Sequence, residues 1–181
     1  MAQTFDLNRN HFELFGIAPR FGIDLDALNR SYRRIQGEVH PDRFTHLPGA
    51  AQRSAMQWAT HVNGAYQTLK SPQARARYLI ELGGAALDER GGTGLPVAFL
   101  TEQMEWREKV EAARERQDSA ELSALEQESE AEMQQCCLEL ERTLDRERDL
   151  DASRVGLYRL MFLDKLSAEI GDAIEAIETA T

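Results

Sequence analysis

Three consecutive residues, His40-Pro41-Asp42, carry the side chains of this 181-residue chain that could most directly do chemistry. A histidine and a carboxylate two positions apart could act as a general base with its orienting partner, or as two ligands of a metal ion. The chain offers no serine or cysteine nucleophile near them and no third ligand, and His11, His46 and His61 lack ligand spacing. A metal-dependent hydrolase is therefore the weakest interpretation. The structural alternative is a polar loop in which the proline ends a helix.

The two cysteines, Cys136 and Cys137, are the other candidates for metal or redox chemistry. Neighbours on one helix point about 100° apart and cannot reach disulfide geometry. They fall within the apolar stripe of a predicted helix, so we expect Cys136 in the core. We expect no catalytic residue, no metal ion and no cofactor. Two reduced thiols indicate a cytoplasmic protein.

The net charge of −10 is unevenly distributed along the chain. Residues 1–90 carry 11 basic and 9 acidic side chains, whereas residues 91–181 carry 10 basic and 22 acidic ones. The acidic half disfavours nucleic-acid binding, which depends on Lys and Arg side chains that neutralise phosphates. No stretch approaches the roughly 18 apolar residues of a membrane span, and the first residues lack a signal-peptide pattern. We expect neither nucleic acid nor a membrane as a partner, and two modules that meet different partners.

Helical periodicity accounts for the first half of the chain. Asp24 is a good N-cap for a helix that runs to about Val39, and a second helix is predicted over roughly 50–69. Two such helices, each with one apolar face, pack antiparallel. Short helices are predicted near His11–Phe15 and after Pro72. The expected apolar stripe of the first long helix consists of Leu25, Leu28, Tyr32, Ile35 and Val39.

The second half follows a Gly/Pro-rich segment, 83–96, and reads as three helices. Their predicted ranges are Val97–Arg116, Ala120–Arg148 and Ala152–Thr179. The short polar connections between them predict antiparallel neighbours and hence a three-helix bundle. Strand signals are nearly absent along the whole chain. The predicted fold class is therefore all-α.

The helix predicted over 97–116 carries two separate faces. Its core stripe is expected to contain Phe99, Gln103, Trp106, Val110 and Ala113. A second face gathers Leu100, Thr101, Met104, Glu105 and Glu108. A second face that is apolar and acidic is more than one core contact needs, and it indicates a partner-binding surface. The alternative is a wider buried face with a solvated acidic edge.

Three segments of the first half match a known module in order and spacing. These are the run Phe12–Ile17, the helix that ends at His40-Pro41-Asp42, and the run Val62–Leu69. Over residues 10–82 the chain resembles a J-domain. The resemblance implies an antiparallel helical hairpin with short flanking helices that activates a DnaK-class ATPase.

The second half narrows the match to one family. The runs Ala98–Glu108 and Phe162–Leu166 resemble the C-terminal domain of the HscB family of iron–sulfur co-chaperones, and the absence of an N-terminal cysteine-rich segment is typical of its bacterial members. The resemblance implies a J-domain at 1–82, a linker at 83–96 and a scaffold-binding three-helix domain at 97–181.

This resemblance also implies partners and contact residues. The protein would be a non-enzymatic co-chaperone that brings an IscU-like iron–sulfur scaffold to an HscA-like chaperone, stimulates its ATPase and aids cluster transfer. The implied chaperone-binding residues are His40, Pro41, Asp42, Arg30, Arg33, Arg34 and Arg43. The implied scaffold-binding residues are Leu100, Thr101, Met104, Glu105, Glu108 and Phe162.

The roles of two of these residues, and the identity of the client, each allow a second interpretation. Thr101 stands where the family commonly has a larger apolar residue, and Phe162 falls beside the core stripe of the last helix, so it is either core or contact. The alternative function is a J-domain co-chaperone that delivers a different client, with the acidic bundle as a docking or dimerisation arm.

Overall fold

The structure is a computed structural model that describes residues 9–38, 49–87 and 95–179. Every regular element in that part of the chain is a helix, so the predicted all-α class is confirmed. The chain divides into two compact units, Met1–Leu79 and Ile80–Thr181. This division falls inside helix α4 (Pro72–Leu82), whereas the predicted J-domain extends to residue 82.

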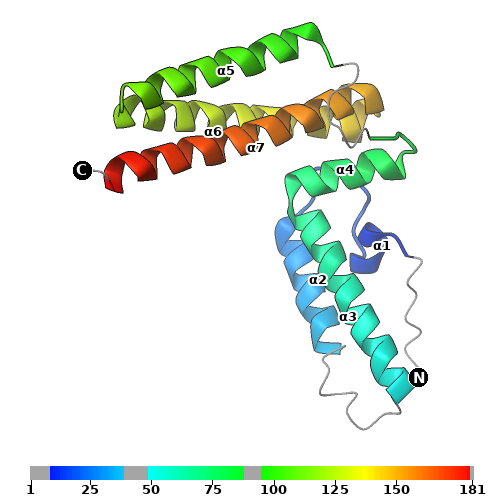
Figure 1. Cartoon of the computed structure of the whole chain (residues 1–181). Helices are drawn as coiled ribbons and strands as arrows, with labels where there is room; N and C mark the ends of the chain where they lie inside the picture. The colour runs from blue at the N-terminus through cyan, green and yellow to red at the C-terminus, as the bar shows by residue number, and fades with distance from the viewer. Residues whose placement is uncertain (1–8, 39–48, 88–94, 180–181) are drawn as a thin grey trace. The chain divides into compact units, whose positions relative to one another are not determined.

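The first unit is built on two long helices, α2 (Leu25–Glu38) and α3 (Gly49–Lys70), which run antiparallel side by side (Figure 1). The short helix α1 (His11–Phe15) precedes them and has the predicted bounds. Asp24 caps α2 as expected, because its Oδ1 accepts hydrogen bonds from the backbone N–H groups of Asp26 and Ala27.

The core of this unit joins α1, α2 and α3. Its buried side chains include Phe12, Phe15, Leu28, Ile35, Trp58, Val62 and Leu69. Leu25 was predicted to belong to this stripe, but it is 45% exposed. Helical side chains lean towards the N-terminus, so the side chain of the first residue of α2 projects past the packed part of the helix. Val39 lies outside the described residues.

Two hydrogen bonds fix how α2 is turned against α3. The Tyr32 hydroxyl donates to Asn63 at 2.9 Å, and the Tyr66 hydroxyl donates to Asn29 at 2.8 Å. The two tyrosine rings stack with centroids 4.0 Å apart. Because hydrogen bonds are directional, this reciprocal pair sets which face of α2 is left to solvent.

The second unit is a bundle of α5 (Val97–Glu115), α6 (Ser119–Glu141) and α7 (Leu150–Thr179). In Figure 1, α6 runs antiparallel to both α5 and α7. The bundle core includes Trp106, Val110, Leu122, Leu125, Leu163, Leu166 and Ile170. α6 and α7 pack against each other far more extensively than α5 packs against either.

The prediction of one continuous helix over Ala120–Arg148 is wrong at its C-terminal end. α6 ends at Glu141, and the chain continues as a π-helical turn, η2 (Arg142–Glu147). Arg148 then adopts a φ of 55°, and α7 begins at Leu150 instead of the predicted Ala152.

Contacts that span five residues or cross to α7 stabilise this turn. Arg142 pairs with Glu147 at 2.6 Å, a spacing of five residues that matches the i→i+5 register of a π-helix. The Ser153 hydroxyl donates to the buried Thr143 hydroxyl at 2.9 Å. Sequence periodicity misses such a turn because apolar spacing does not record five-residue polar pairs or contacts with the next helix.

Candidate functional site

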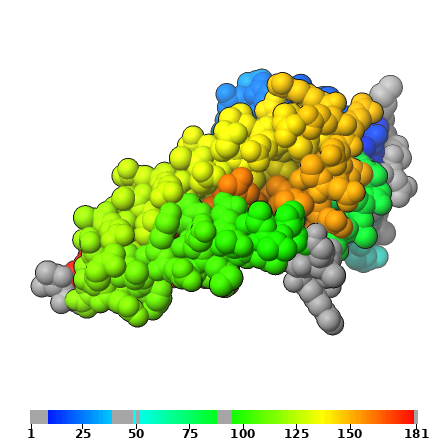
Figure 2. Space-filling model, turned by 90° about the horizontal axis from the view of Figure 1, so that it is seen from above, coloured from blue at the N-terminus to red at the C-terminus, as the bar shows by residue number. Residues whose placement is uncertain are grey.

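One side of α5 forms the candidate partner-binding surface. Figure 2 shows α5, in green, on the outer surface of the bundle. Leu100 is 43% exposed and Met104 is 63% exposed, although both are large apolar side chains. Thr101, Glu105 and Glu108 are exposed as well. The structure therefore places all five predicted α5 residues in solvent, and we call them the α5 face.

The opposite side of α5 explains why this surface faces outward. Phe99, Trp106, Val110 and Ala113 are buried, as the core stripe predicted, and Gln103 is half-buried. At 3.6 residues per turn, anchoring these positions in the core leaves Leu100 and Met104 on the solvent side.

Phe162 of α7 is the one predicted contact that does not lie on α5. Its side chain is half-buried and packs against the bundle core. The ring meets Phe99 edge to face with centroids 6.3 Å apart, and the Arg107 guanidinium lies 5.9 Å from its centroid. Phe162 thus packs with the core while part of its ring stays accessible.

In the first unit, three predicted chaperone-binding residues are described. Arg30, Arg33 and Arg34 are exposed on α2, on the side away from the buried Leu28 and Ile35. Arg30 pairs with Asp24 at 3.6 Å and Arg34 with Glu38 at 3.6 Å, both in solvent. Exposed pairs of this kind contribute little to stability, so the arginines stay available for a partner. His40, Pro41, Asp42 and Arg43 lie outside the described residues.

Comparison with known proteins decides the family. A family model described as the HSCB C-terminal oligomerisation domain matches residues 95–171. The "Co-chaperone protein HscB homolog" of Aromatoleum aromaticum is 45% identical over 176 residues, which cover 97% of this chain and 99% of that relative. The chain belongs to the HscB co-chaperone family.

Solved structures of HscB proteins agree with this assignment. The chaperone HscB from Vibrio cholerae matches with a TM-score of 0.82 and 32% identity, covering 93% of this chain and 99% of that one. The human co-chaperone protein HscB matches with a TM-score of 0.85 and 26% identity, covering 92% of this chain and 82% of that one. The fold predicted from the J-domain and HscB resemblance is thus the fold of solved family members.

In this HscB family member, a half-buried polar cluster joins the three helices of the bundle and is not predicted from the sequence. Arg159 of α7 hydrogen-bonds to Glu102 of α5 at 2.8 Å and to Glu132 of α6 at 2.9 Å, and it lies 3.8 Å from Glu139. Burial alone lowers the pKa of Arg159, but its hydrogen bond to Glu102 and the charge of both carboxylates raise it above its ordinary value. No sequence spacing indicates this cluster, because its members lie on three different helices.

Cys136 lies beside this cluster and in the core, as expected. Its side chain is buried, and its Sγ lies 3.2 Å from the carbonyl oxygen of Gly156. Burial raises the pKa of the Cys136 thiol to about 12, although the positive charge of Arg159 opposes the shift. Such a thiol is a poor nucleophile and a poor metal ligand at neutral pH.

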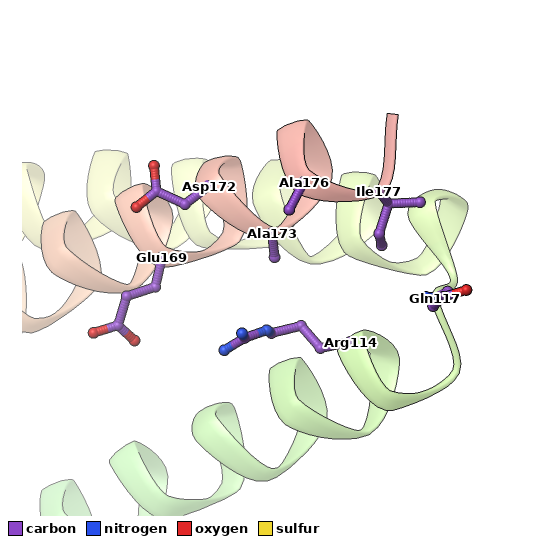
Figure 3. Close-up of a pocket in the computed structure, with 7 residues that line it drawn as sticks. All are labelled: Arg114, Gln117, Glu169, Asp172, Ala173, Ala176 and Ile177. Carbon is purple, nitrogen blue, oxygen red and sulfur yellow. The ribbon is translucent and has the colours of Figure 1, made fainter. Parts of the chain in front are cut away.

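A shallow pocket of about 390 Å³ lies between the C-terminal parts of α5 and α7 (Figure 3). Arg114 reaches from α5 towards Glu169 of α7, and the apolar wall comes from α7. Its lining residues are Arg114, Gln117, Glu169, Asp172, Ala173, Ala176 and Ile177. None of these seven residues belongs to the set that the sequence predicted as a binding site.

Metal binding and membrane insertion each need a particular arrangement of side chains. Within ranges 9–38, 49–87 and 95–179, no group of three or more His, Cys, Asp or Glu side chains could hold a metal ion. In that same part of the chain, none of the helices combines the length and apolar character that crossing a membrane requires.

Proposed function

We propose that this protein is a non-enzymatic co-chaperone that recruits an IscU-like iron–sulfur scaffold to an HscA-like chaperone of the DnaK class. It stimulates ATP hydrolysis by the chaperone and thereby aids cluster transfer to iron–sulfur proteins. The observation that carries the proposal is the exposed Leu100 and Met104 pair with its acidic neighbours on α5, in a chain similar to HscB proteins over nearly its full length.

The scaffold binds the α5 face through an apolar centre with a charged edge. Leu100 and Met104 lie one helical turn apart, so a single hydrophobic patch of the scaffold can cover both. Glu105 and Glu108 border the pair and favour a partner with basic residues around that patch. Thr101 adds little to scaffold affinity, because its hydroxyl already donates a hydrogen bond within α5, to the Val97 carbonyl oxygen at 3.1 Å. The accessible part of Phe162 belongs to the same contact.

The first unit engages the chaperone. His40-Pro41-Asp42 and Arg43 contact the chaperone and favour its hydrolysis-competent conformation, while the α2 arginines attract an acidic surface on it. The exposure of Arg30, Arg33 and Arg34 supports this role. The hydrolysis itself takes place on the chaperone, and this protein contributes no catalytic group.

One chain that holds both partners raises the local concentration of the scaffold at the chaperone. Linking two binding events in this way increases the occupancy of the second without any new contact. The proposal therefore needs two separable surfaces, one in each half of the chain.

The test measures both activities in two reciprocal variants. The double variant Leu100→Ala, Met104→Ala removes apolar groups worth about 1–3 kcal/mol each when fully buried, so scaffold affinity should fall at least tenfold by calorimetry. Stimulation of the chaperone's basal ATPase should persist. His40→Gln should abolish that stimulation and leave scaffold affinity unchanged. Unchanged scaffold binding in the double variant, with its helicity intact, would refute the α5 site.

The family model's description as an oligomerisation domain favours a second candidate function. In this alternative the chain is a J-domain co-chaperone for a different client, and the acidic bundle is a docking or dimerisation arm. Light scattering of the purified chain between 1 and 100 µM, a range of about a hundredfold around typical transient affinities, tests self-association. A concentration-dependent dimer that Leu100→Ala, Met104→Ala disperses, together with no affinity for the scaffold, would favour the alternative.

A further inference from the structure

The side chain of Glu102 leaves α5 on the side opposite Leu100 and Met104. At about 100° per residue, Glu102 lies about 180° around the helix from the midpoint of Leu100 and Met104. Its side chain is 30% exposed and therefore half-buried. Any group that holds Glu102 in the bundle therefore turns Leu100 and Met104 outward.

Arg159 of α7 is the group that holds Glu102. Its Nε and one terminal nitrogen both donate to Oε1 of Glu102, at 3.2 and 2.8 Å. The same terminal nitrogen also donates to Glu132 of α6 at 2.9 Å. The Arg159 side chain is only 25% exposed, so water screens these charge-assisted bonds less than it screens a surface pair. One guanidinium thus connects all three helices of the bundle.

The apolar contacts of α5 define its position less closely than the hydrogen bonds of Arg159 do. α5 packs against α6 and α7 less extensively than they pack against each other. Apolar burial is non-directional and tolerates small rotations or shifts of a helix, whereas a hydrogen bond does not. The turn at Gln117 and Asp118 joins the C-terminal end of α5 to α6, far from Leu100 along the helix. Close to the α5 face, Glu102 provides the directional link.

We propose that Arg159 is a positioning residue for scaffold binding, which acts through Glu102 to hold α5 in the rotation that presents Leu100 and Met104. The inference rests on the proposed function, because it concerns the same surface. It assigns to Arg159 no contact with the scaffold.

The experiment compares two variants with the same charge change beside the same arginine. Glu102→Ala removes the hydrogen bonds from Arg159 to α5. Glu132→Ala removes its hydrogen bond to α6, leaves its ion pair with Glu139 of α6, and keeps α5 attached. Affinity for a purified IscU-type scaffold is measured by calorimetry at a temperature where both variants are folded. We expect Glu102→Ala to weaken binding at least fivefold and Glu132→Ala to weaken it less than twofold.

Trp106 reports the position of α5 independently of binding. It is buried at 5% exposure on α5, and the only other tryptophan, Trp58, is removed by a Trp58→Phe background. Glu102→Ala should shift Trp106 emission to longer wavelength, whereas Glu132→Ala should not. If either alanine variant fails to fold, the pair Glu102→Gln and Glu132→Gln replaces it, with the same expected order of affinities.

The outcomes separate this inference from the proposed function. If Leu100→Ala, Met104→Ala abolishes scaffold binding but the Glu102 and Glu132 variants bind equally well or equally poorly, Arg159 has no positioning role and the α5 site stands. If the Leu100 and Met104 variant still binds the scaffold, the proposed function itself fails. A fivefold loss confined to Glu102→Ala, with the emission shift, supports the positioning role.

Discussion

At the scale of single residues, His11 is a half-buried titratable group whose Nδ1 atom is buried without a hydrogen-bond partner. Its ring stacks on Tyr78 with centroids 4.2 Å apart and meets His61 edge to face at 5.7 Å. Nδ1 of His11 has no hydrogen-bond partner in the structure. Burial lowers the pKa of His11, and the nearby His61 lowers it further. The folded first unit therefore disfavours a positive charge at this position.

This lowered pKa makes stability depend on pH. Unfolded His11 binds a proton near its ordinary pKa of 6.5, and the folded residue does so only at lower pH. Its stabilising contribution is thus complete above pH 6.5 and declines as the pH falls towards the folded pKa. We expect the free energy of unfolding to decrease from pH 7.5 to pH 5. Urea titrations monitored by Trp58 fluorescence, in a Trp106→Phe background, measure this free energy at each pH. His11→Phe keeps the stacked ring and should reduce this decrease, and an identical decrease in both proteins would contradict the assignment.

At the scale of elements, α7 contains two glycines in different surroundings. A Cβ at Gly156 would lie 3.0 Å from Cδ2 of Leu140, a side chain that is 1% exposed. A Cβ at Gly171 would meet only Glu126 Oε1, at 3.9 Å. The close approach of α6 and α7 at Gly156 therefore depends on the missing side chain.

The two Gly→Ala variants should change stability in opposite directions. Gly171→Ala should stabilise the bundle by about 0.5–1 kcal/mol, because alanine restricts the unfolded chain and favours helix. Gly156→Ala gains the same stabilisation from alanine in a helix. It also forces Leu140 to move in a filled core, which costs about 1–3 kcal/mol. Thermal unfolding followed by circular dichroism should show a raised midpoint for the first variant and a lowered one for the second. Equal midpoints would show that Leu140 repacks around the added methyl group without loss of stability.

At the scale of the whole molecule, the two halves carry different charge. The first 90 residues have a small positive excess, and the rest of the chain accounts for the whole negative charge. The exposed arginines of α2 belong to the positive half, and the α5 face belongs to the acidic half. Under the proposed function, such a distribution would direct two partners of opposite surface charge to separate halves of the chain.

Chaperone binding should therefore depend on ionic strength. The Debye length falls from about 30 Å at 0.01 M salt to about 8 Å at 0.15 M, so ATPase stimulation at a fixed low concentration should weaken over this range. Arg30→Glu with Arg34→Glu should lower the association rate measured by stopped flow and flatten its salt dependence. Arg20→Glu with Lys70→Glu makes the same charge change at positions outside α2 and should have a smaller effect. Salt-independent rates in the unmodified protein would exclude the α2 arginines as the contact.

Local sequence patterns alone predict most of the helices and the face that each of them buries. Capping at Asp24, the bounds of α1 and the alternation of Phe99, Trp106 and Val110 with Leu100 and Met104 are local properties, fixed within a few residues by helix geometry. The α5 face could be predicted for this reason, and so could the buried position of Cys136.

Features that depend on residues far apart in the sequence follow from how the helices pack and could not be predicted from the sequence. The pairing of Arg159 with Glu102 joins positions 57 residues apart, and the π-helical turn at Arg142–Glu147 is fixed partly by Ser153 of the next helix. The environment of Phe162 could not be predicted for the same reason, because its half-buried state follows from Phe99 and Arg107 on another helix. Periodicity records how a helix divides its own surface, but which polar groups meet across helices depends on how those helices pack.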